Sequence, residues 1–249
     1  MAPLTLIFHG ELNGLLPASY QNCPGILADT RRRASIKDIV ESFGVPHTEV
    51  GTILHQGQEL PFAYIPEASE IIHIQPHQPP VDISSQTLLQ PTVLEAHKFV
   101  VDVNVGKLAR LLRMLGFDTA YQSKWSDSWI AELAWQEGRI VLSRDKGLLK
   151  RKKIEYGRLL RSQQPKTQLQ EVLSLFALQQ EVRLFSRCLR CNCLLQAVRK
   201  ERIAHLLLPK TKKYFHEFCI CPGCERIYWP GSHMQKMQHL VQTMKPDLR

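Results

Sequence analysis

Two aspartates lie at the ends of two short apolar segments. Asp102 lies within the run Phe99–Val103, and Asp145 follows the run Arg139–Ser143. Short runs rich in Val, Ile and Leu are typical of buried strands in a parallel sheet. Because parallel strands end at one edge of their sheet, both carboxylates would face one crevice. Gathered carboxylates favour Mg²⁺ or Mn²⁺, which can activate water to attack a phosphate. Strand-end aspartates also cap helices or form turns, and for either aspartate alone that structural role is favoured.

Basic side chains accompany both aspartates. The helical pattern after Asp102 carries Lys and Arg at three-residue steps, and residues 144–161 carry eight basic side chains against two acids. Like charges at this density repel one another, and a phosphate backbone would relieve the repulsion. A solvated helix flank is the simpler alternative for the helix. The residues expected to bind nucleic acid are Lys107, Arg110, Arg113, Arg144, Lys146, Lys150, Arg151 and Lys152.

Two CxxC pairs near the C-terminus form the strongest motif in the chain. The first pair is Cys188 and Cys191, and the second pair is Cys221 and Cys224. Each pair can present two thiolates to one metal, so the pairs together predict a tetrahedral Cys₄ zinc site, the zinc-ribbon pattern. A closed Cys₄ site has no open position for substrate, so this zinc would stabilise the fold. The alternative ligands are Cys193 and Cys219.

Composition describes a globular chain with a basic excess. Its 249 residues include 32 basic and 23 acidic side chains, a balance that favours a polyanionic partner such as RNA. No apolar run approaches the length of a membrane span, and the N-terminus lacks a signal-peptide pattern. We therefore expect a cytoplasmic protein with reduced thiols.

The N-terminal segment has the pattern of a small β-grasp domain. LTLIF reads as a strand, Ser35 can cap a helix that Gly44 ends, and two further strand patterns close the segment at EIIHIQP. Residues 76–91 are rich in Pro, Gln and Ser, as linkers are. Histidines in the segment are scattered, which does not indicate a catalytic cluster.

The middle and C-terminal motifs resemble one known family. DVNVGKLARLLRMLGFDT, followed by RIVLSRDKGLLKR, strongly resembles the Mut-seven C-terminal RNase domains, a branch of the PIN-like nucleases. RCLRCN and the tail CPGCERIYWPGSH resemble the zinc ribbon of the same family, and the N-terminal segment is similar to the ubiquitin-like domain that commonly precedes it. Val105 is one departure, because the family usually has Leu at that position.

This resemblance implies a metal-dependent RNase whose acidic site maps onto Asp102, Asp127 and Asp145. Asp118 is a weaker candidate. By sequence alone, Asp127 is more simply the cap of the helix that it begins, and Glu132 is an alternative third acid. Four residues of the tail could contact RNA: Arg226, Tyr228, Trp229 and His233. The alternative for Tyr228 and Trp229 is that they cover the zinc knuckle.

The expected fold is α/β: a PIN-like parallel-sheet domain with an N-terminal β-grasp domain and a C-terminal zinc ribbon. The expected divisions are a ubiquitin-like domain at 1–79, a linker at 80–96, the RNase domain at 97–182, and the ribbon with its tail at 183–249. The expected function is hydrolysis of RNA by Mg²⁺ or Mn²⁺ at the aspartates, with structural zinc in the ribbon and a protein partner for the ubiquitin-like domain. The alternative is a non-catalytic RNA-binding or adaptor protein.

Overall fold

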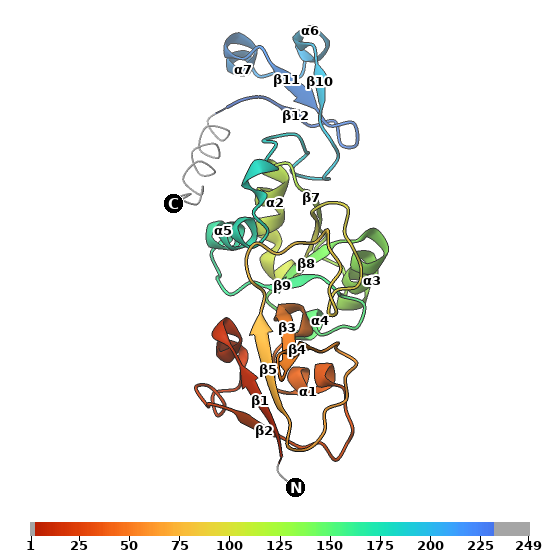
Figure 1. Ribbon diagram of the computed structural model, residues 1–249. Coiled ribbons are helices and arrows are strands. Elements are labelled where there is room, and N and C mark those ends of the chain that lie inside the picture. The colour runs from red at the N-terminus through yellow and green to blue at the C-terminus, as the bar shows by residue number, and fades with distance from the viewer. Residues whose placement is uncertain (1–2, 232–249) are drawn as a thin grey trace.

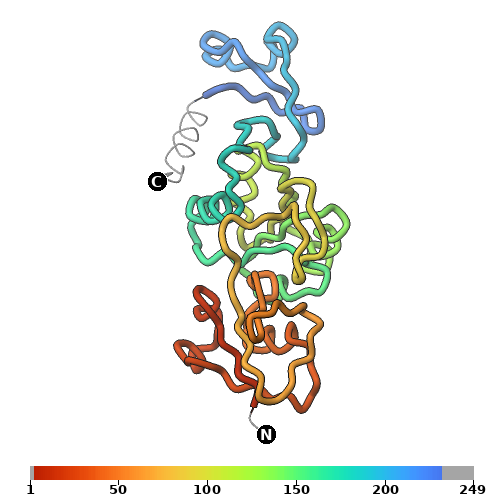
Figure 2. The backbone as a smooth tube through the Cα atoms, viewed as in Figure 1, coloured from red at the N-terminus to blue at the C-terminus, as the bar shows by residue number. Residues whose placement is uncertain are grey.

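The computed structural model describes residues 3–231, which form three parts arranged in a row (Figure 1). The N-terminal part lies at one end, the part with the aspartates lies in the middle, and the cysteine-rich part lies at the other end, as the backbone trace also shows (Figure 2). Residues 232–249, which include the candidate RNA contact His233, lie outside the described residues. Within those residues, no helix is both long and apolar enough to cross a membrane.

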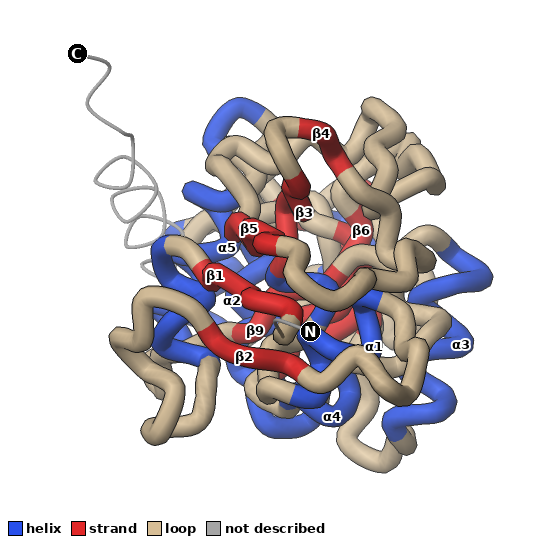
Figure 3. The backbone as a smooth tube through the Cα atoms, turned by 60° about the horizontal axis from the view of Figure 1, so that its bottom comes forward, coloured by secondary structure: helices blue, strands red, loops and turns tan. Residues whose placement is uncertain are grey.

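A five-stranded sheet and one helix build the N-terminal part. The strand order is β2-β1-β5-β3-β4, with β1 and β5 parallel and the other neighbours antiparallel (Figure 3). The elements are β1 (Leu4–Phe8), η1 (Gly10–Leu15), β2 (Ile26–Ala28), α1 (Ile36–Ser42), η2 (His47–Glu49), β3 (Val50–His55), β4 (Gln58–Glu59) and β5 (Ile71–Pro76). Ser35 caps α1 by accepting a hydrogen bond from the Asp38 N–H at 3.2 Å, as its sequence pattern predicts. This is the predicted β-grasp arrangement.

Four parallel strands form the sheet of the middle part, in the order β7-β6-β8-β9. The elements are β6 (Lys98–Val101), η3 (Val103–Val105), α2 (Gly106–Met114), β7 (Asp118–Ala120), α3 (Asp127–Glu137), β8 (Ile140–Ser143), α4 (Lys146–Leu149), β9 (Gly157–Leu159) and α5 (Pro165–Leu175). Phe99 and Val101 pack with α2 and α5 on one face, whereas Val100 packs with α3 and α4 on the other. The predicted layered α/β fold is confirmed, and all four strands end at the same edge of the sheet.

Each edge strand of this sheet is closed by a side chain from a neighbouring part. The backbone N–H of Leu159 in β9 donates to Glu49 of the N-terminal part at 2.7 Å. The backbone N–H of Thr119 in β7 donates to Asn192 of the cysteine-rich part at 3.0 Å. Open strand edges invite pairing with other chains, so both flanking parts protect the sheet.

The N-terminal part docks on the middle part through a buried charged contact. Arg158 of β9 donates to Glu11 at 2.8 Å, to Glu49 at 3.0 Å and to Glu171 at 2.9 Å. Burial raises the pKa of the Glu49 carboxyl, although Arg158 and the Leu159 N–H oppose that effect. Burial also disfavours the charge of Arg158, but the three carboxylates raise its pKa overall. Apolar side chains of both parts surround this contact in one continuous core, so the two parts are packed as one unit.

The segment predicted as a linker, residues 80–96, contains no helix or strand but lies against the middle part. Ile83 and Leu94 are buried in the core of that part. The Val81 N–H donates to the Leu175 carbonyl at 2.7 Å. A few apolar residues spaced between the prolines and serines are therefore enough to hold this segment in place.

The cysteine-rich part contains a small antiparallel sheet in the order β10-β11-β12. Its elements are β10 (Gln196–Val198), α6 (Lys200–Ile203), α7 (Pro209–Tyr214), β11 (Phe218–Ile220) and β12 (Ile227–Tyr228). The two short helices fill the long interval between the CxxC pairs and project away from the middle part (Figure 1).

Candidate active site and metal centre

Asp102 follows β6 directly and is held by three hydrogen bonds. One carboxylate oxygen accepts from the Val103 N–H at 2.5 Å, which caps η3. The other accepts from the Ser143 hydroxyl at 2.7 Å and from the Asn104 amide. The residue is only 5% exposed, so these neighbours fix the orientation of the carboxylate.

Asp145 lies two residues after β8 and is connected to Asp102 through Ser143. The Ser143 oxygen accepts from the Asp145 N–H at 2.8 Å while its hydroxyl donates to Asp102. The Asp145 carboxylate accepts from the Gly147 N–H at 2.6 Å and caps α4. Asp145 thus caps a helix with its carboxylate while its backbone is linked to Asp102 through Ser143, and the residue is exposed whereas Asp102 is buried.

Asp127 begins α3, but it does not cap that helix. The cap is Ser126, whose oxygen accepts from the Trp129 N–H at 3.3 Å. The Asp127 carboxylate instead lies 3.9 Å from the Arg151 guanidinium, and both side chains are nearly half exposed. A contact of this length in water holds neither group firmly. The structure therefore links Asp102 to Asp145, and it links Asp127 to the basic segment after α4.

The two alternative acids have other partners. Asp118 lies at the start of β7, the opposite end of the sheet from Asp102, and pairs with Arg139 at 2.7 Å and Arg187 at 3.3 Å. Burial acts to raise its pKa, but the two guanidinium groups hold that pKa below its usual value. Glu132 pairs with Lys153, and the same contact lowers its pKa. These contacts explain both acids without a metal.

A groove of about 520 Å³ is lined by Val103 and Asn104, the two residues that directly follow Asp102 in the chain. Lys107 and Arg110 of α2 line it, together with Tyr121 and Gln163. Both basic side chains are exposed, and they lie in the first half of α2, the helix that follows Asp102 and η3 in the chain. Arg144, Arg151 and Lys152 are exposed as well.

Three of the predicted RNA-binding residues make contacts within the protein instead. Arg113 is 5% exposed and donates to the carbonyls of Thr119 at 2.9 Å and Arg190 at 2.8 Å, which ties α2 to the cysteine-rich part. Lys146 donates to the Leu15 carbonyl at 2.7 Å, where η1 ends. Lys150 donates to the carbonyl of Glu41, near the end of α1, at 2.6 Å. Cations are favoured at helix C-termini, so both lysines fasten the N-terminal part.

Sequence reasoning did not identify Ser143 and Asn104. The Asn104 side chain donates to Asp102 and accepts from the Arg144 N–H at 3.2 Å, so it also joins the two strand ends. Ser143 is fully buried, although it is polar and ends an apolar strand. A polar residue in that position was the signal available in the sequence, because buried hydroxyls require partners.

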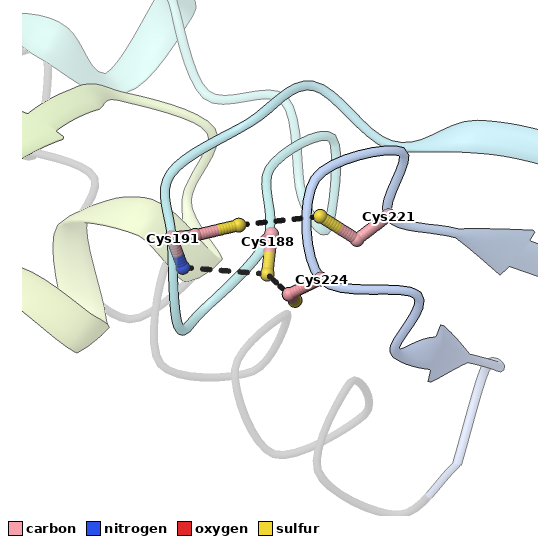
Figure 4. A group of neighbouring side chains, drawn as sticks. All are labelled: Cys188, Cys191, Cys221 and Cys224. Atoms are coloured by element: carbon pink, nitrogen blue, oxygen red, sulfur yellow. Dashed lines mark hydrogen bonds between the residues drawn. The ribbon is translucent and has the colours of Figure 1, made fainter.

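The four cysteines of the CxxC pairs lie together (Figure 4). Their sulfur atoms are all within 4.8 Å of one another, with 3.3 Å between Cys191 and Cys221 and 3.5 Å between Cys188 and Cys224. Among residues 3–231, this is the one group of three or more His, Cys, Asp or Glu side chains close enough to share a metal ion. The three aspartates do not form such a group in this conformation.

Hydrogen bonds around Cys188 favour the thiolate form of its side chain. Burial would raise the pKa of its thiol, but the Tyr228 hydroxyl and the backbone N–H groups of Arg190 and Cys191 lower that pKa to about 6. Metals bind the thiolate rather than the thiol. Cys193, by contrast, has its sulfur 4.0 Å from the Cys191 carbonyl oxygen and stays outside the four-sulfur group.

The fold and the cysteine group together define a class of protein: a PIN-like α/β domain between a β-grasp domain and a ribbon with four clustered cysteines. Comparison with family models agrees. Residues 97–241 match the Mut7-C RNAse domain, and residues 1–82 match the Mut7-C ubiquitin domain. The first match covers more than half of the chain, so the chain belongs to the Mut7-C RNase family. No curated protein and no solved structure matches it.

Proposed function

We propose that this protein is a metal-dependent ribonuclease that hydrolyses RNA phosphodiester bonds at Asp102, Asp127 and Asp145. The observation that supports this proposal best is the link through Ser143, which bonds the Asp102 carboxylate and the Asp145 backbone N–H at the ends of neighbouring parallel strands. Carboxylate oxygens are suitable ligands for Mg²⁺ or Mn²⁺. Asp127 lies at the N-terminus of α3 and contacts Arg151 only weakly, so its carboxylate is free to turn towards a metal.

The chain's own residues would position the RNA. Lys107 and Arg110 line the groove beside Asp102 and supply cations for two phosphates. Arg144, Arg151 and Lys152 extend the positive surface past Asp145. A bound Mg²⁺ or Mn²⁺ would supply an activated water and stabilise the charge on the phosphate. Ser143 and Asn104 would keep the Asp102 carboxylate oriented while that charge develops.

We further propose that the four-cysteine group binds zinc with a structural role. Zn–S bonds of about 2.3 Å in a tetrahedron place the sulfurs roughly 3.8 Å apart, close to the spacing seen here. Four protein ligands complete the coordination of zinc, so the ion would connect β11 to the knuckle that Arg113 contacts.

A second function, RNA binding without catalysis, is favoured by one observation. Asp102 and Asp145 both accept backbone N–H groups, and the three aspartates are not assembled as a ligand set. In that case the ubiquitin-like domain and the ribbon would recruit a protein partner to RNA. Cleavage activity distinguishes the two functions.

Cleavage of labelled single-stranded RNAs by the full chain tests the proposal. The wild type and the Asp102→Asn and Asp145→Asn variants would be assayed with Mg²⁺, with Mn²⁺ and without added metal. Asparagine can still accept the capping hydrogen bonds, so folding should be retained. We expect both variants to lose at least about a hundredfold in rate, a loss typical for a group that stabilises charge in the transition state.

The matched control is Asp29→Asn, because Asp29 is an exposed aspartate paired only with its neighbour Arg31. It should cleave like the wild type. Equal cleavage by all four proteins, or RNA binding without cleavage under either metal, would contradict the proposal.

A further inference from the structure

The cysteine-rich part carries most of the net positive charge of the chain. Residues 183–231 contain ten Lys and Arg side chains and three Glu, whereas the whole chain has a net charge of +9. Several of these cations lie on the two short helices, α6 and α7, which project from the ribbon. The positive charge of the ribbon would therefore attract a polyanion to this part of the molecule.

An apolar groove of about 590 Å³ opens on the same part of the molecule. Trp229 lines it and is 39% exposed, although it also contacts the rings of Phe215 and Phe218 at 6.2 and 6.5 Å between centroids. Its ring is therefore held in place by two aromatic neighbours while part of it faces solvent. The other lining residues that matter here are Arg199, His216, Glu217 and Tyr228.

The four-cysteine group fixes one wall of this groove through Tyr228. Tyr228 lines the groove, and its hydroxyl lies 3.1 Å from the Cys188 sulfur and accepts from the Leu189 N–H at 3.1 Å. Tyr228 is therefore preorganised, because these contacts hold its side chain before a ligand binds. Preorganisation reduces the free-energy cost of ordering a site on binding.

We propose that this groove binds an unpaired base of single-stranded RNA, stacked on Trp229, with the neighbouring phosphate held by Arg199. Aromatic platforms inside a positive surface are the usual means of binding single strands, because every base offers a flat face. The basic excess of the ribbon favours RNA over an apolar peptide segment. Glu217 can accept a hydrogen bond from the amino group of a base.

The groove shares no lining residue with the groove beside Asp102, so it is a second RNA contact, separate from the cleavage site. The inference rests on the proposed substrate class, RNA, but not on catalysis. Binding and cleavage can therefore be measured separately.

Fluorescence anisotropy with labelled single-stranded RNA of eight or more nucleotides, without added Mg²⁺ or Mn²⁺, tests the site on the full chain. Trp229→Ala should weaken binding about tenfold, the effect of removing a stacking platform, and Trp229→Phe should retain most of the affinity. Arg199→Gln should weaken binding and reduce the slope of log affinity against log salt by about one.

The matched control is Trp135→Ala, because Trp135 is also an exposed tryptophan, on α3, at 64% exposure. It should bind RNA like the wild type. Metal content and melting temperature, measured for each variant, identify any variant whose ribbon has unfolded. If Trp229→Ala unfolds, the RNA affinities of Trp229→Phe and Arg199→Gln test the proposed site.

Unchanged RNA affinity in a folded Trp229→Ala variant would overturn the inference. Tighter binding of a peptide than of RNA would overturn it too. If Trp229→Ala binds RNA normally while Asp102→Asn abolishes cleavage, the proposed base-binding site is refuted and the proposed ribonuclease activity is supported. If Trp229→Ala loses RNA binding and neither the wild type nor any variant cleaves RNA, the base-binding site is supported and the ribonuclease activity is refuted.

Discussion

Ser143 joins the two acidic strand ends through a single oxygen atom. It donates to one carboxylate and accepts from the backbone of the other aspartate, and it is fully buried. Buried hydroxyls that satisfy two partners make a fixed geometry. At the scale of single residues, the candidate site therefore depends on a side chain that would not itself touch the RNA.

Replacing Ser143 with Ala should reduce cleavage with little change in RNA affinity. The substitution leaves Asp102 without one donor and the Asp145 N–H without its acceptor, at a cost of about 1–3 kcal/mol in unfolding free energy. We expect the cleavage rate to fall about tenfold and the RNA dissociation constant to stay within a factor of two of the wild type, in line with a positioning effect.

Chemical denaturation and single-turnover kinetics would measure both effects. Ser128→Ala, an exposed serine on α3, is the control. Full activity in the Ser143→Ala variant would show that the link does not orient the carboxylates.

Three of the residues predicted to bind RNA have contacts within the protein that the sequence did not predict, and their partners are distant in the chain. Lys146 and Lys150 lie in a basic run, and only the folded chain shows that carbonyls 131 and 109 residues away accept from them. Arg113 repeats on a helix face in the sequence, yet it is buried against the ribbon. A local sequence pattern shows charge and periodicity, but it does not show whether a basic side chain binds an RNA phosphate or a backbone carbonyl that is distant in the chain.

By contrast, the elements themselves could be predicted well. Apolar periodicity and capping residues act locally, and they predict the strand before Asp102 and the helix after Ser35. They also predict that β6, β7 and β8 follow one another along the chain with helices between them. The packing of residues 80–96 could not be predicted, because their few buried side chains are diluted by Pro and Ser.

At the scale of elements, β7 is held to the ribbon by Asp118 and Asn192. Asn192 accepts from the Thr119 N–H and also donates to Asp118 at 2.9 Å. Arg187 adds an ion pair from the ribbon side. One carboxylate thus connects an edge strand with the neighbouring part.

Stability at this junction should fall at acidic pH. The pKa of Asp118 is lowered from its ordinary 3.8, because its bonds to Arg139, Asn192 and Arg187 outweigh burial. A lowered pKa means that the contribution is complete above about pH 5 and is lost as pH falls through 3.8 towards the folded value.

Melting temperatures of the wild type and Asp118→Asn between pH 7 and pH 3 would test this. We expect the variant to melt several degrees lower at pH 7, and the difference to shrink towards pH 3. A difference that is constant across this range would show that the carboxylate charge does not stabilise the junction.

At the scale of the whole molecule, the ubiquitin-like domain is part of the core that supports the candidate site. Leu148, Leu149 and Ile154 pack in one cluster with side chains of the β-grasp sheet. Lys146, next to Asp145, bonds to the same domain. This domain therefore borders the end of the sheet that carries Asp145, and the middle part covers some of its surface.

Removing residues 1–78 should yield an aggregating protein. The deletion exposes an apolar face and leaves Arg158 without Glu11 and Glu49. Large exposed apolar patches lead to association. Size-exclusion chromatography and binding of a hydrophobic dye would measure the effect, with the full chain as reference. A monomeric truncated protein that cleaves RNA at the normal rate would show that the domain is only appended.

The two side chains that close the edges of the parallel sheet are made at different times during translation. Glu49, which closes β9, leaves the ribosome before the sheet exists, whereas Asn192, which closes β7, leaves 73 residues after its partner Thr119. A nascent chain therefore carries one protected edge and one open edge while the ribbon is still being synthesised. Chains that stop before the ribbon would keep that edge open permanently, and they are the species most prone to pair with one another.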